Sequence, residues 1–508
     1  MVRRNYWDGL QRRLTRRRLL AAAATLTGSL AAGAACGGAI NAPLNATPHP
    51  GPPQAGGALR LALFFDPDDL DPATGGFAFP VFQRVYSFLF HLHGKTFEYM
   101  PDLAIDFEQP DEVTYIFGLR RGVNFHDLQP VSGRELTAQD VLYTLDRLKL
   151  AFNSIDPGFM WRIAKSVEAP NDHMVKITTQ KPYASALQIL GGFWYAIVPH
   201  ELAEMYRGLS KNAIGSGPFI LERFEQESGA ALRRNPDYYG APEPYLDALE
   251  IGVVGDYTNL LTQFRTKNLD VNTAPLDSPR WEALRRELNG VQSSKNPGIL
   301  APWIGMNINR PPLNDPRVRR AIDIGIDRRQ MIDVLAFGDG KLNGPIPWGN
   351  EIWALPQEEL EAFYVHDPVE ARRLLEEAGV DDVKLKHVVT TALPLGREIG
   401  AIIKEQLRPL GIDITIEVLE QNAFIERVFL QRRFDTCGFD WFPVLDPTVS
   451  LRFVDSGDIF GRIFGFFDPE VGRLYDRMQS TFDLEQRIAV VHELQRAVLK
   501  LHGPVLYL

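Results

Sequence analysis

The chain has 508 residues, of which 45% are hydrophobic and 23% are charged, and it contains two cysteines. These values are ordinary for globular proteins, so they exclude disorder over most of the chain, and two cysteines exclude a disulfide framework or a four-thiolate zinc site. Residues 1–35 hold seven arginines and one aspartate, a net charge of +6, so the rest of the chain must carry −16 to give the overall −10. Such an acidic body argues against nucleic acid as a partner, because that binding rests on basic side chains.

The N-terminal segment predicts an exported protein. The pair Arg16-Arg17 precedes an apolar, alanine-rich run from Leu19 to Cys36 and resembles a twin-arginine export signal. This run is interrupted by glycine and is too short and too weakly apolar for a good membrane span. It ends in Gly33-Ala34-Ala35-Cys36, which is similar to a lipoprotein box and predicts lipidation of Cys36; the alternative is a plain cleavage site that ends near a cysteine. Either reading places the protein in the periplasm or at the outer face of the cytoplasmic membrane.

The segments that follow predict a mixed α/β fold. Residues 37–56 are rich in proline, alanine and glycine and are expected to form a flexible tether. Alternating apolar residues predict strands at 59–63, 113–119, 175–179 and 412–418. Helical periodicity and capping residues predict helices at 81–89, 137–148, 316–335, 371–378 and 399–407. No internal repeat of about 20–50 residues is present, which excludes solenoids and propellers.

No segment carries a recognisable catalytic arrangement. Gly215-Ser216-Gly217 lacks the spacing of a nucleophile elbow, and Gly338-Asp339-Gly340-Lys341 lacks residues that phosphate-binding loops require. His91 and His93 would share one face of a strand, but two imidazoles do not complete a zinc site. Cys437 is followed by apolar residues, which favours a buried and unreactive thiol. The sequence therefore predicts no enzyme, no bound metal and no cofactor.

Nine sequence blocks occur in a characteristic order after the tether. They are Asp69–Pro72, Val85–Leu89, Met100–Ala104, Phe117–Asp127, Leu136–Val141, Gly215–Phe219, Arg234–Gly240, Asn309–Asp327 and Asp367–Gly379. Through these blocks the chain from Gly57 to Leu508 resembles the bacterial extracellular solute-binding proteins of family 5, the peptide/nickel type that serve ABC importers. The export signal, the tether and the acidic body agree with this resemblance independently.

The resemblance implies an α/β fold with two lobes, of the type II periplasmic-binding-protein kind, and an extra domain inserted in the first lobe. The expected limits are 57–86 and 196–297 for the first lobe, 87–195 for the inserted domain, 298–483 for the second lobe, and 484–508 for a C-terminal return to the first lobe that stops short of the usual family length. The Phe125-His126-Asp127 turn lies in the expected insert, where a structural role is favoured over a partner surface.

The resemblance also implies a function. A protein of this kind captures a peptide or another small polar solute between its two lobes and delivers it to an ABC permease that works with a separate ATPase. We expect a monomer, held at the membrane by the lipid on Cys36. A ligand sensor for a membrane partner is the alternative, and an exported hydrolase is a weaker one because no acid/base pair stands at recognisable spacing.

The resemblance places the ligand site in the second lobe, near a loop that ends in an acid-proline pair. Aromatic side chains give a cleft a large apolar contact area of fixed shape. The residues expected to bind ligand are Trp441, Phe439 and Phe442 as walls, Asp440 as a polar anchor, Asp446 in the acid-proline pair, and Trp303 and Asn307 as secondary contacts.

One position departs from the peptide-binding pattern. Peptide-binding members carry an aspartate four residues before the proline of that pair, where it pairs with the α-amino group of the peptide, and this chain has Pro443 there. Either Asp440 takes over the pairing, or the ligand is an uncharged or anionic solute such as a sugar or another small metabolite. The sequence leaves both open.

Overall fold

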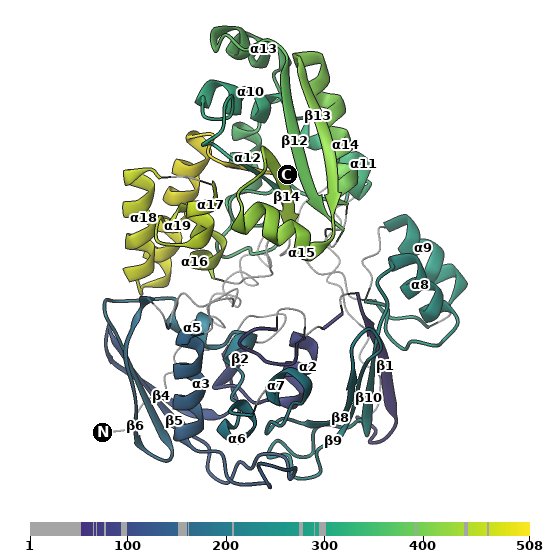
Figure 1. The fold of residues 1–508 in the computed structure, drawn as a ribbon, viewed down its shortest axis with the longest axis vertical. Coiled ribbons are helices and arrows are strands. Elements are labelled where there is room, and N and C mark those ends of the chain that lie inside the picture. The colour runs from purple at the N-terminus through teal and green to yellow at the C-terminus, as the bar shows by residue number, and fades with distance from the viewer. Residues whose placement is uncertain are drawn as a thin grey trace, which may run out of the picture. The chain divides into compact units, whose positions relative to one another are not determined.

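The computed structural model describes residues 52–508 except 65, 68, 76–77, 93–98, 151–159, 161, 206–207, 274–277, 289, 294–300, 392, 394, 441–445 and 465–466. The chain divides into two compact units (Figure 1). Unit 1 contains the described residues of Met1–Pro182, Ala186–Pro275 and Gln292–Ser294, and unit 2 those of Tyr183–Ser185, Leu276–Val291 and Lys295–Leu508. In this described part of the chain, no helix has the length and apolar character needed to cross a membrane.

Unit 1 contains a mixed sheet built from both ends of its sequence. Its order is β1-β10-β9-β8, formed by Ala58–Leu63, Ala248–Val253, Gly229–Arg234 and Phe219–Glu225. Strand β1 pairs with β10 in parallel, and the other neighbours are antiparallel. The strand predicted at 59–63 is therefore confirmed.

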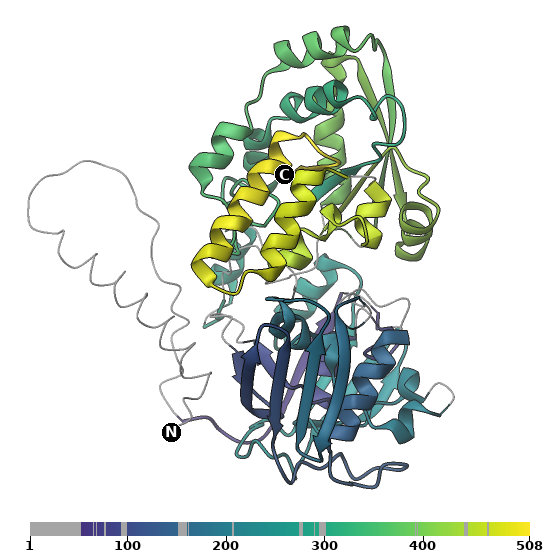
Figure 2. The same ribbon diagram turned by 90° about the vertical axis from the view of Figure 1, so that its left-hand side faces the viewer.

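A second sheet of unit 1 is entirely antiparallel. Its order is β4-β5-β7-β6, formed by Ala104–Asp111, Thr114–Leu119, Met174–Thr179 and Ala164–Asn171, and its strands run side by side in Figure 2. Helix α3 (Ala138–Leu150) packs against β6 and β7. The strands predicted at 113–119 and 175–179 are confirmed, and this sheet lies inside the expected insert, whose limits at 87 and 195 stay a prediction.

The remaining elements of unit 1 are short. They are α2 (Phe79–Val85), β2 (Phe90–Leu92), β3 (Tyr99–Pro101), α5 (Ala186–Leu190), η1 (Phe193–Tyr195), α6 (His200–Ala203), α7 (Gly208–Lys211) and α8 (Tyr257–Arg265). The helix predicted at 81–89 was too long at its C-terminal end. Helix α2 stops at Val85 because Tyr86 adopts an extended backbone, with φ −99° and ψ 161°.

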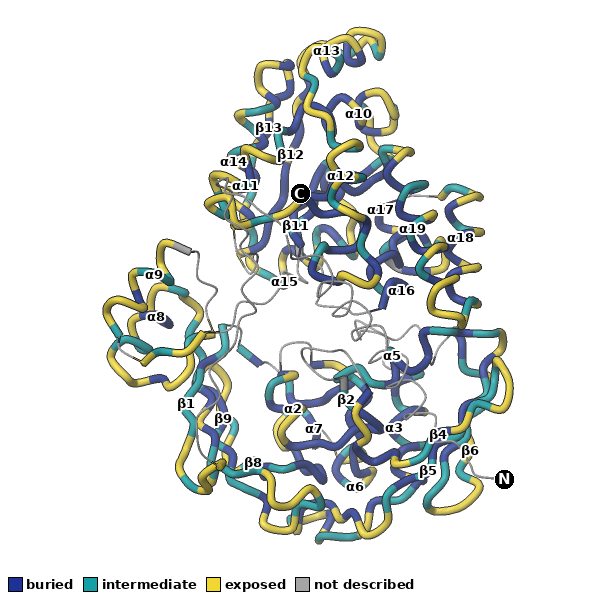
Figure 3. Tube along the Cα trace, turned by 180° about the vertical axis from the view of Figure 1, so that it is seen from behind, coloured by how far each residue is buried: buried dark blue, intermediate teal, exposed yellow. Residues whose placement is uncertain are grey.

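Unit 2 is built on a five-stranded sheet. Its order is β13-β12-β14-β11-β15, formed by Ile412–Leu419, Val383–Thr390, Thr436–Asp440, Pro302–Met306 and Val505–Tyr507. Strand β12 is parallel to both β13 and β14, whereas β11 is antiparallel to β14 and β15. The central strands are largely buried, and helices such as α13 expose one face (Figure 3).

Helices account for most of the rest of unit 2. They are α9 (Ser278–Glu287), α10 (Pro316–Gly325), α11 (Arg328–Ala336), α12 (Gln357–Phe363), α13 (Pro368–Glu377), α14 (Gly396–Leu407), η2 (Arg408–Leu410), α15 (Gln421–Phe424), the π-helical turn η3 (Ile425–Leu430), α16 (Pro447–Ser450), η4 (Arg452–Val454), α17 (Ile459–Phe464), α18 (Pro469–Ser480) and α19 (Leu484–Lys500). The single helix predicted at 316–335 was wrong. The structure has two helices there, because Ile326 is extended and Asp327 caps α11 by accepting a hydrogen bond from Gln330 N at 3.0 Å.

The C-terminal segment differs from the expected return to the first lobe. Residues 484–508 belong to unit 2. Strand β15 pairs with β11, and the backbone carbonyl of Tyr507 accepts a hydrogen bond from Arg328 Nε at 2.7 Å. The next carbonyl, that of Leu508, accepts one from Asn343 Nδ2 at 2.7 Å. Strand pairing and two buried donors therefore fix this segment within unit 2.

An ion pair joins one of the resemblance blocks to helix α3 in unit 1. The Asp71 carboxylate caps its own turn by accepting a hydrogen bond from Ala73 N at 3.0 Å, and it accepts another from Arg147 Nη1 at 2.7 Å. Asp71 is buried, and the Arg147 side chain is one-quarter exposed. Removing one member of such a pair leaves a buried charge without its partner.

We predict that Arg147→Ala lowers the free energy of unfolding of unit 1 by about 3 kcal/mol, the lower end for a broken buried ion pair. Chemical denaturation of the purified protein measures this. The matched control is Lys149→Ala on the same helix, whose partner Asp146 is 62% exposed, so that this change should cost less than about 1 kcal/mol. Equal effects of the two variants would contradict the prediction.

Two buried histidines predict acid sensitivity. Burial lowers the pKa of His126 and of His387 to about 4, against an ordinary value of 6.5. Because the unfolded chain then binds more protons between pH 6.5 and 4, stability is complete above pH 6.5 and falls as the pH drops through this window, by up to about 3 kcal/mol for each histidine. Urea unfolding at pH 7 and pH 5 measures the loss. His387→Gln should reduce the pH dependence of unit 2, and His366→Gln at an exposed position should not.

Candidate ligand-binding site

The carboxyl edge of the unit 2 sheet is the natural place for a ligand. Strands β12, β13, β14 and β15 all end at this edge, and the antiparallel β11 begins there, with Pro302 opposite Asp440 and Trp303 opposite Tyr507. In open α/β sheets, ligands bind outside the carboxyl ends of the strands. The loop expected to carry the ligand contacts follows β14 in the sequence, and β14 ends at this edge.

Trp303 and Phe439 form the buried base of the edge. Their rings lie 4.0 Å apart between centroids with an interplanar angle of 44°, and the two side chains are 5% and 8% exposed. Phe439 also packs against Phe429, Phe460 and Phe464. The structure thus gives Phe439 a core role, and its role as a ligand wall stays a prediction.

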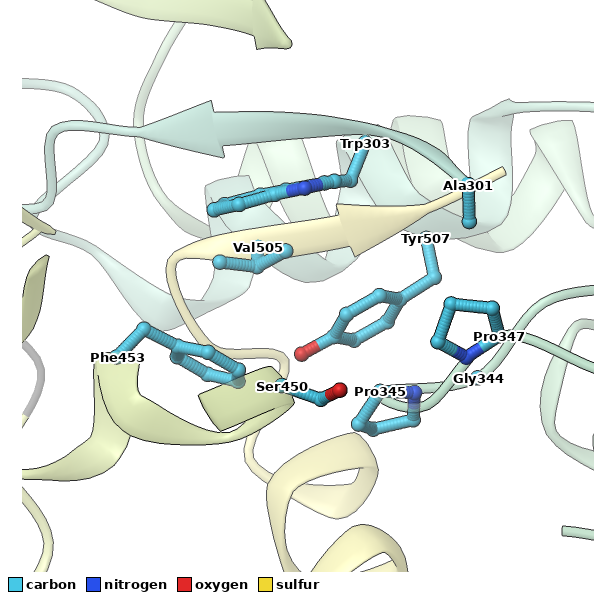
Figure 4. Close-up of a pocket in the computed structure, with 9 residues that line it drawn as sticks. All are labelled: Ala301, Trp303, Gly344, Pro345, Pro347, Ser450, Phe453, Val505 and Tyr507. Carbon is cyan, nitrogen blue, oxygen red and sulfur yellow. The ribbon is translucent and has the colours of Figure 1, made fainter. Parts of the chain in front are cut away.

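A small cavity opens beside Trp303. Its volume is about 20 Å³, and nine residues line it, including Trp303, Ser450 and Tyr507 (Figure 4). A single water needs roughly 10–15 Å³ by this kind of measure, so the cavity holds one small molecule at most. It is far too small to be the whole site for a peptide or a sugar.

Trp441, Phe442 and the departure at Pro443 lie outside the described residues, and only the backbone of Asp440 is described, at the end of β14. Cys36, Arg16 and Arg17, the expected lipidation and export residues, also lie outside them.

Asp446 is engaged by protein groups of unit 2. Its carboxylate caps α16 by accepting a hydrogen bond from Thr448 N at 2.8 Å, and it accepts further hydrogen bonds from Ser185 Oγ at 2.8 Å and Arg487 Nη2 at 3.2 Å. The Asp446 and Arg487 side chains are only 1% and 4% exposed. This arrangement stabilises the end of the loop, and a ligand contact by Asp446 stays a prediction.

Asn307 lies at the other end of β11. Its Nδ2 donates to the carbonyls of Arg432 and Phe434, each at 3.3 Å, and its backbone N–H donates to Asp435 O at 2.9 Å. It lies four positions after Trp303 along the chain, a span of roughly 13 Å. The structure therefore does not bring these two expected contacts together.

Several residues at carboxyl edges were missed by sequence reasoning. In unit 2, Thr390 ends β12 and its hydroxyl donates to Gln421 Oε1 at 2.8 Å. In unit 1, Phe64 and Tyr257 follow the parallel strands β1 and β10, and their rings stack with centroids 4.0 Å apart and an interplanar angle of 12°. Only their positions in the sequence could have pointed to them, because each of these residues ends a strand, follows a strand or begins the next helix.

The residues considered for thiol chemistry and for metal binding lie among other protein groups. Cys437 is buried, as predicted, and burial raises the pKa of its thiol. His91 Nε2 lies 3.0 Å from Asp102 Oδ2. Among the described residues, which exclude His93, no three His, Cys, Asp or Glu side chains are grouped as metal ligands would be.

Comparison with known proteins shows the family. The model of the bacterial extracellular solute-binding proteins, family 5 Middle, matches residues 98–458, more than two thirds of the chain. The chain belongs to this family. It therefore has the α/β fold of two-lobed (type II) periplasmic binding proteins, and its family consists of solute-binding proteins and not of enzymes.

Individual relatives cover most of this solute-binding protein. It is 25% identical over 465 residues to di/tripeptide-binding protein 2 of Pseudomonas aeruginosa (strain UCBPP-PA14), covering 85% of each chain. The ABC transporter-associated periplasmic binding protein DppA from Helicobacter pylori, solved with the peptide STSA, is 26% identical with a TM-score of 0.78, covering 90% of this chain and 92% of that one. AgaA from A. tumefaciens R10, solved with agropinic acid, is 21% identical with a TM-score of 0.76 and covers 89% and 91%, which shows a shared fold.

We predict that Asp446→Asn destabilises unit 2 by about 3–5 kcal/mol, because it leaves the Arg487 guanidinium buried without a charged partner. Denaturant unfolding of the variant measures this loss. Glu493→Gln is the matched control, since its partner Arg477 is 61% exposed and Glu493 lies on α19, the helix that carries Arg487. A variant of normal stability that fails to bind solute would instead give Asp446 a direct ligand role.

Proposed function

We propose that this solute-binding protein captures a small peptide, or another small polar solute, and delivers it to the permease of an ABC importer. The main support for this proposal is that the chain belongs to the family of solute-binding proteins. The relatives named for di- and tripeptides and the peptide-bound DppA structure support peptide as the first ligand class to test. The agropinic acid complex shows that a protein with this fold also accepts a ligand that is not a peptide.

The ligand contacts are proposed for the loop after β14. Strand β14, which precedes this loop, ends at the carboxyl edge, where Phe439 is paired with Trp303. Trp441 and Phe442 supply broad apolar surfaces there, and Asp440 supplies a carboxylate for a cationic group such as a peptide α-amino group. Because Pro443 offers no charge, Asp440 decides between a peptide and an uncharged solute.

The cellular setting is proposed from the N-terminal segment. The pair Arg16-Arg17 directs export, and a lipid on Cys36 holds the protein at the outer face of the cytoplasmic membrane, where a permease is within reach of the tether formed by 37–56. The protein acts as a monomer, and ATP is used by a separate subunit of the importer.

The proposal is tested by thermal unfolding with a panel of dipeptides, tripeptides, oligosaccharides and opines. A ligand at 100 times its dissociation constant stabilises the folded state by about 2.7 kcal/mol, which gives a clear rise in Tm. We expect Trp441→Ala and Asp440→Ala to abolish the rise with peptides, and Val369→Ala, at an 80% exposed position of α13, to retain it.

The ligand classes give distinct outcomes. A rise with peptides that requires Asp440 supports capture through a replacement anchor. A rise with sugars or opines alone, independent of Asp440, would assign an uncharged or anionic solute to this protein. No rise with any member of the panel, in a protein that unfolds cooperatively, would contradict both ligand assignments.

A further inference from the structure

The small cavity beside Trp303 contains two hydroxyl groups that the solute-binding role does not explain. Ser450 closes helix α16, and Tyr507 belongs to β15. Both line the cavity, and the Tyr507 ring reaches across it so that its hydroxyl lies on the side of Ser450 (Figure 4). The two side chains are 3% and 7% exposed, so bulk water does not satisfy them.

Neither hydroxyl has a partner in the described part of the protein. Ser450 Oγ and Tyr507 Oη make no hydrogen bond to any described residue. Two other tyrosines of unit 2 differ, since the buried Tyr475 donates through Oη to Thr448 O at 2.9 Å and the partly buried Tyr364 donates through Oη to Asn343 O at 2.7 Å. A buried hydroxyl without a partner is costly, and two of them facing one cavity indicate that something within the cavity is their partner.

The size and chemistry of the lining restrict the partner. A volume of about 20 Å³ admits one small group and no more. None of the nine lining residues is charged, so an ammonium or a carboxylate would be buried there without compensation. A third atom with no described partner, Gln495 Oε1, lies 3.6 Å from the point where a Cβ on the lining residue Gly344 would stand, and it accepts hydrogen bonds only.

We propose that the cavity is a binding site for one small neutral oxygen group, held by the hydroxyls of Ser450 and Tyr507. A water molecule has this chemistry, and so does a terminal hydroxyl of the bound solute. Either oxygen accepts from one hydroxyl and pairs with the other, which satisfies both at once. Burial raises the pKa of Tyr507, so its hydroxyl keeps its proton and remains a donor.

A high-resolution crystal structure of the full chain without solute tests the site directly. We expect one ordered oxygen within about 2.7–3.2 Å of both hydroxyl oxygens. A cavity without density, or a direct hydrogen bond between Ser450 and Tyr507 that closes it, would overturn the proposal. This measurement does not depend on the proposed function, because a water can be found in a protein that binds none of the panel.

Structures with the dipeptides Ala-Ala and Ser-Ser distinguish the two sources, and this arm rests on the proposed function. An oxygen that is present with both peptides and separate from them is water. An oxygen supplied by the peptide with Ser-Ser, and by water with Ala-Ala, identifies a subsite for a solute hydroxyl. Both results support the site, whereas loss of the oxygen and repacking of the two hydroxyls with either peptide would contradict it.

A double-mutant cycle provides a test in solution. If Ser450→Ala and Tyr507→Phe remove two bonds to one shared oxygen, their effects on Tm are expected to be non-additive. The matched cycle pairs Ser450→Ala with Tyr475→Phe, whose hydroxyl bonds directly to a carbonyl, and its effects should add. Additive effects in the Ser450–Tyr507 cycle would overturn the shared site, and the crystal structure of the unsubstituted protein decides the matter if a variant fails to fold.

Discussion

Unit 1 depends on a close approach between two backbone segments. A Cβ on Gly215 would lie 2.0 Å from Val85 O, and one on Gly217 would lie 2.7 Å from the same oxygen, so only glycine fits at either position. The contact is closed by a hydrogen bond from Gly217 N to Val85 O at 2.9 Å. The Gly217 carbonyl in turn lies 3.1 Å from His126 Nε2 and accepts from Asn235 Nδ2 at 3.0 Å. Neutral His126, favoured by burial, suits this arrangement because its second nitrogen can accept from Gly215 N.

The blocks that carry the family resemblance therefore specify architecture more than ligand. A second junction works in the same way, since the buried Asp102 accepts from Phe88 N at 2.7 Å and from the Tyr239 hydroxyl. Segments distant in the sequence meet at both junctions, and substitution there leaves a clash or an unpaired buried group. A sequence can thus show this family clearly while leaving its solute open, because the solute contacts are proposed for another segment, the loop after β14.

Local rules predicted the elements that local chemistry controls. Asp315 and Asp367 each precede a proline and cap a helix, accepting from Arg317 N and Val369 N, and the regular alternation at 412–418 forms β13. Asp327 follows the same capping rule at the start of α11. The sequence analysis missed this break because the residues on both sides of it show helical periodicity. The candidate site was harder to predict because its geometry is not local.

Pairing across the chain decides which residues share the carboxyl edge. Trp303 and Tyr507 meet only because β11 and β15 are neighbours in the sheet, and Asp446 at the start of α16 meets Arg487 of α19, 41 residues away in the sequence. No spacing pattern in the sequence predicts either pair. Sequence reasoning could therefore propose the loop after β14 as the ligand site, but it could not predict that the flanking residues Phe439 and Asp446 are buried supports.

The two ends of that loop are held independently of its own sequence. At one end, Phe439 is paired with Trp303 in the sheet and stacked on it, and at the other, Asp446 is tied to Arg487 and Ser185. None of these anchoring contacts involves a residue of 441–445, the segment for which ligand contacts are proposed. If the solute contacts lie in that segment, as proposed, a new specificity can arise from substitutions between the anchors while the contacts that stabilise the fold stay unchanged.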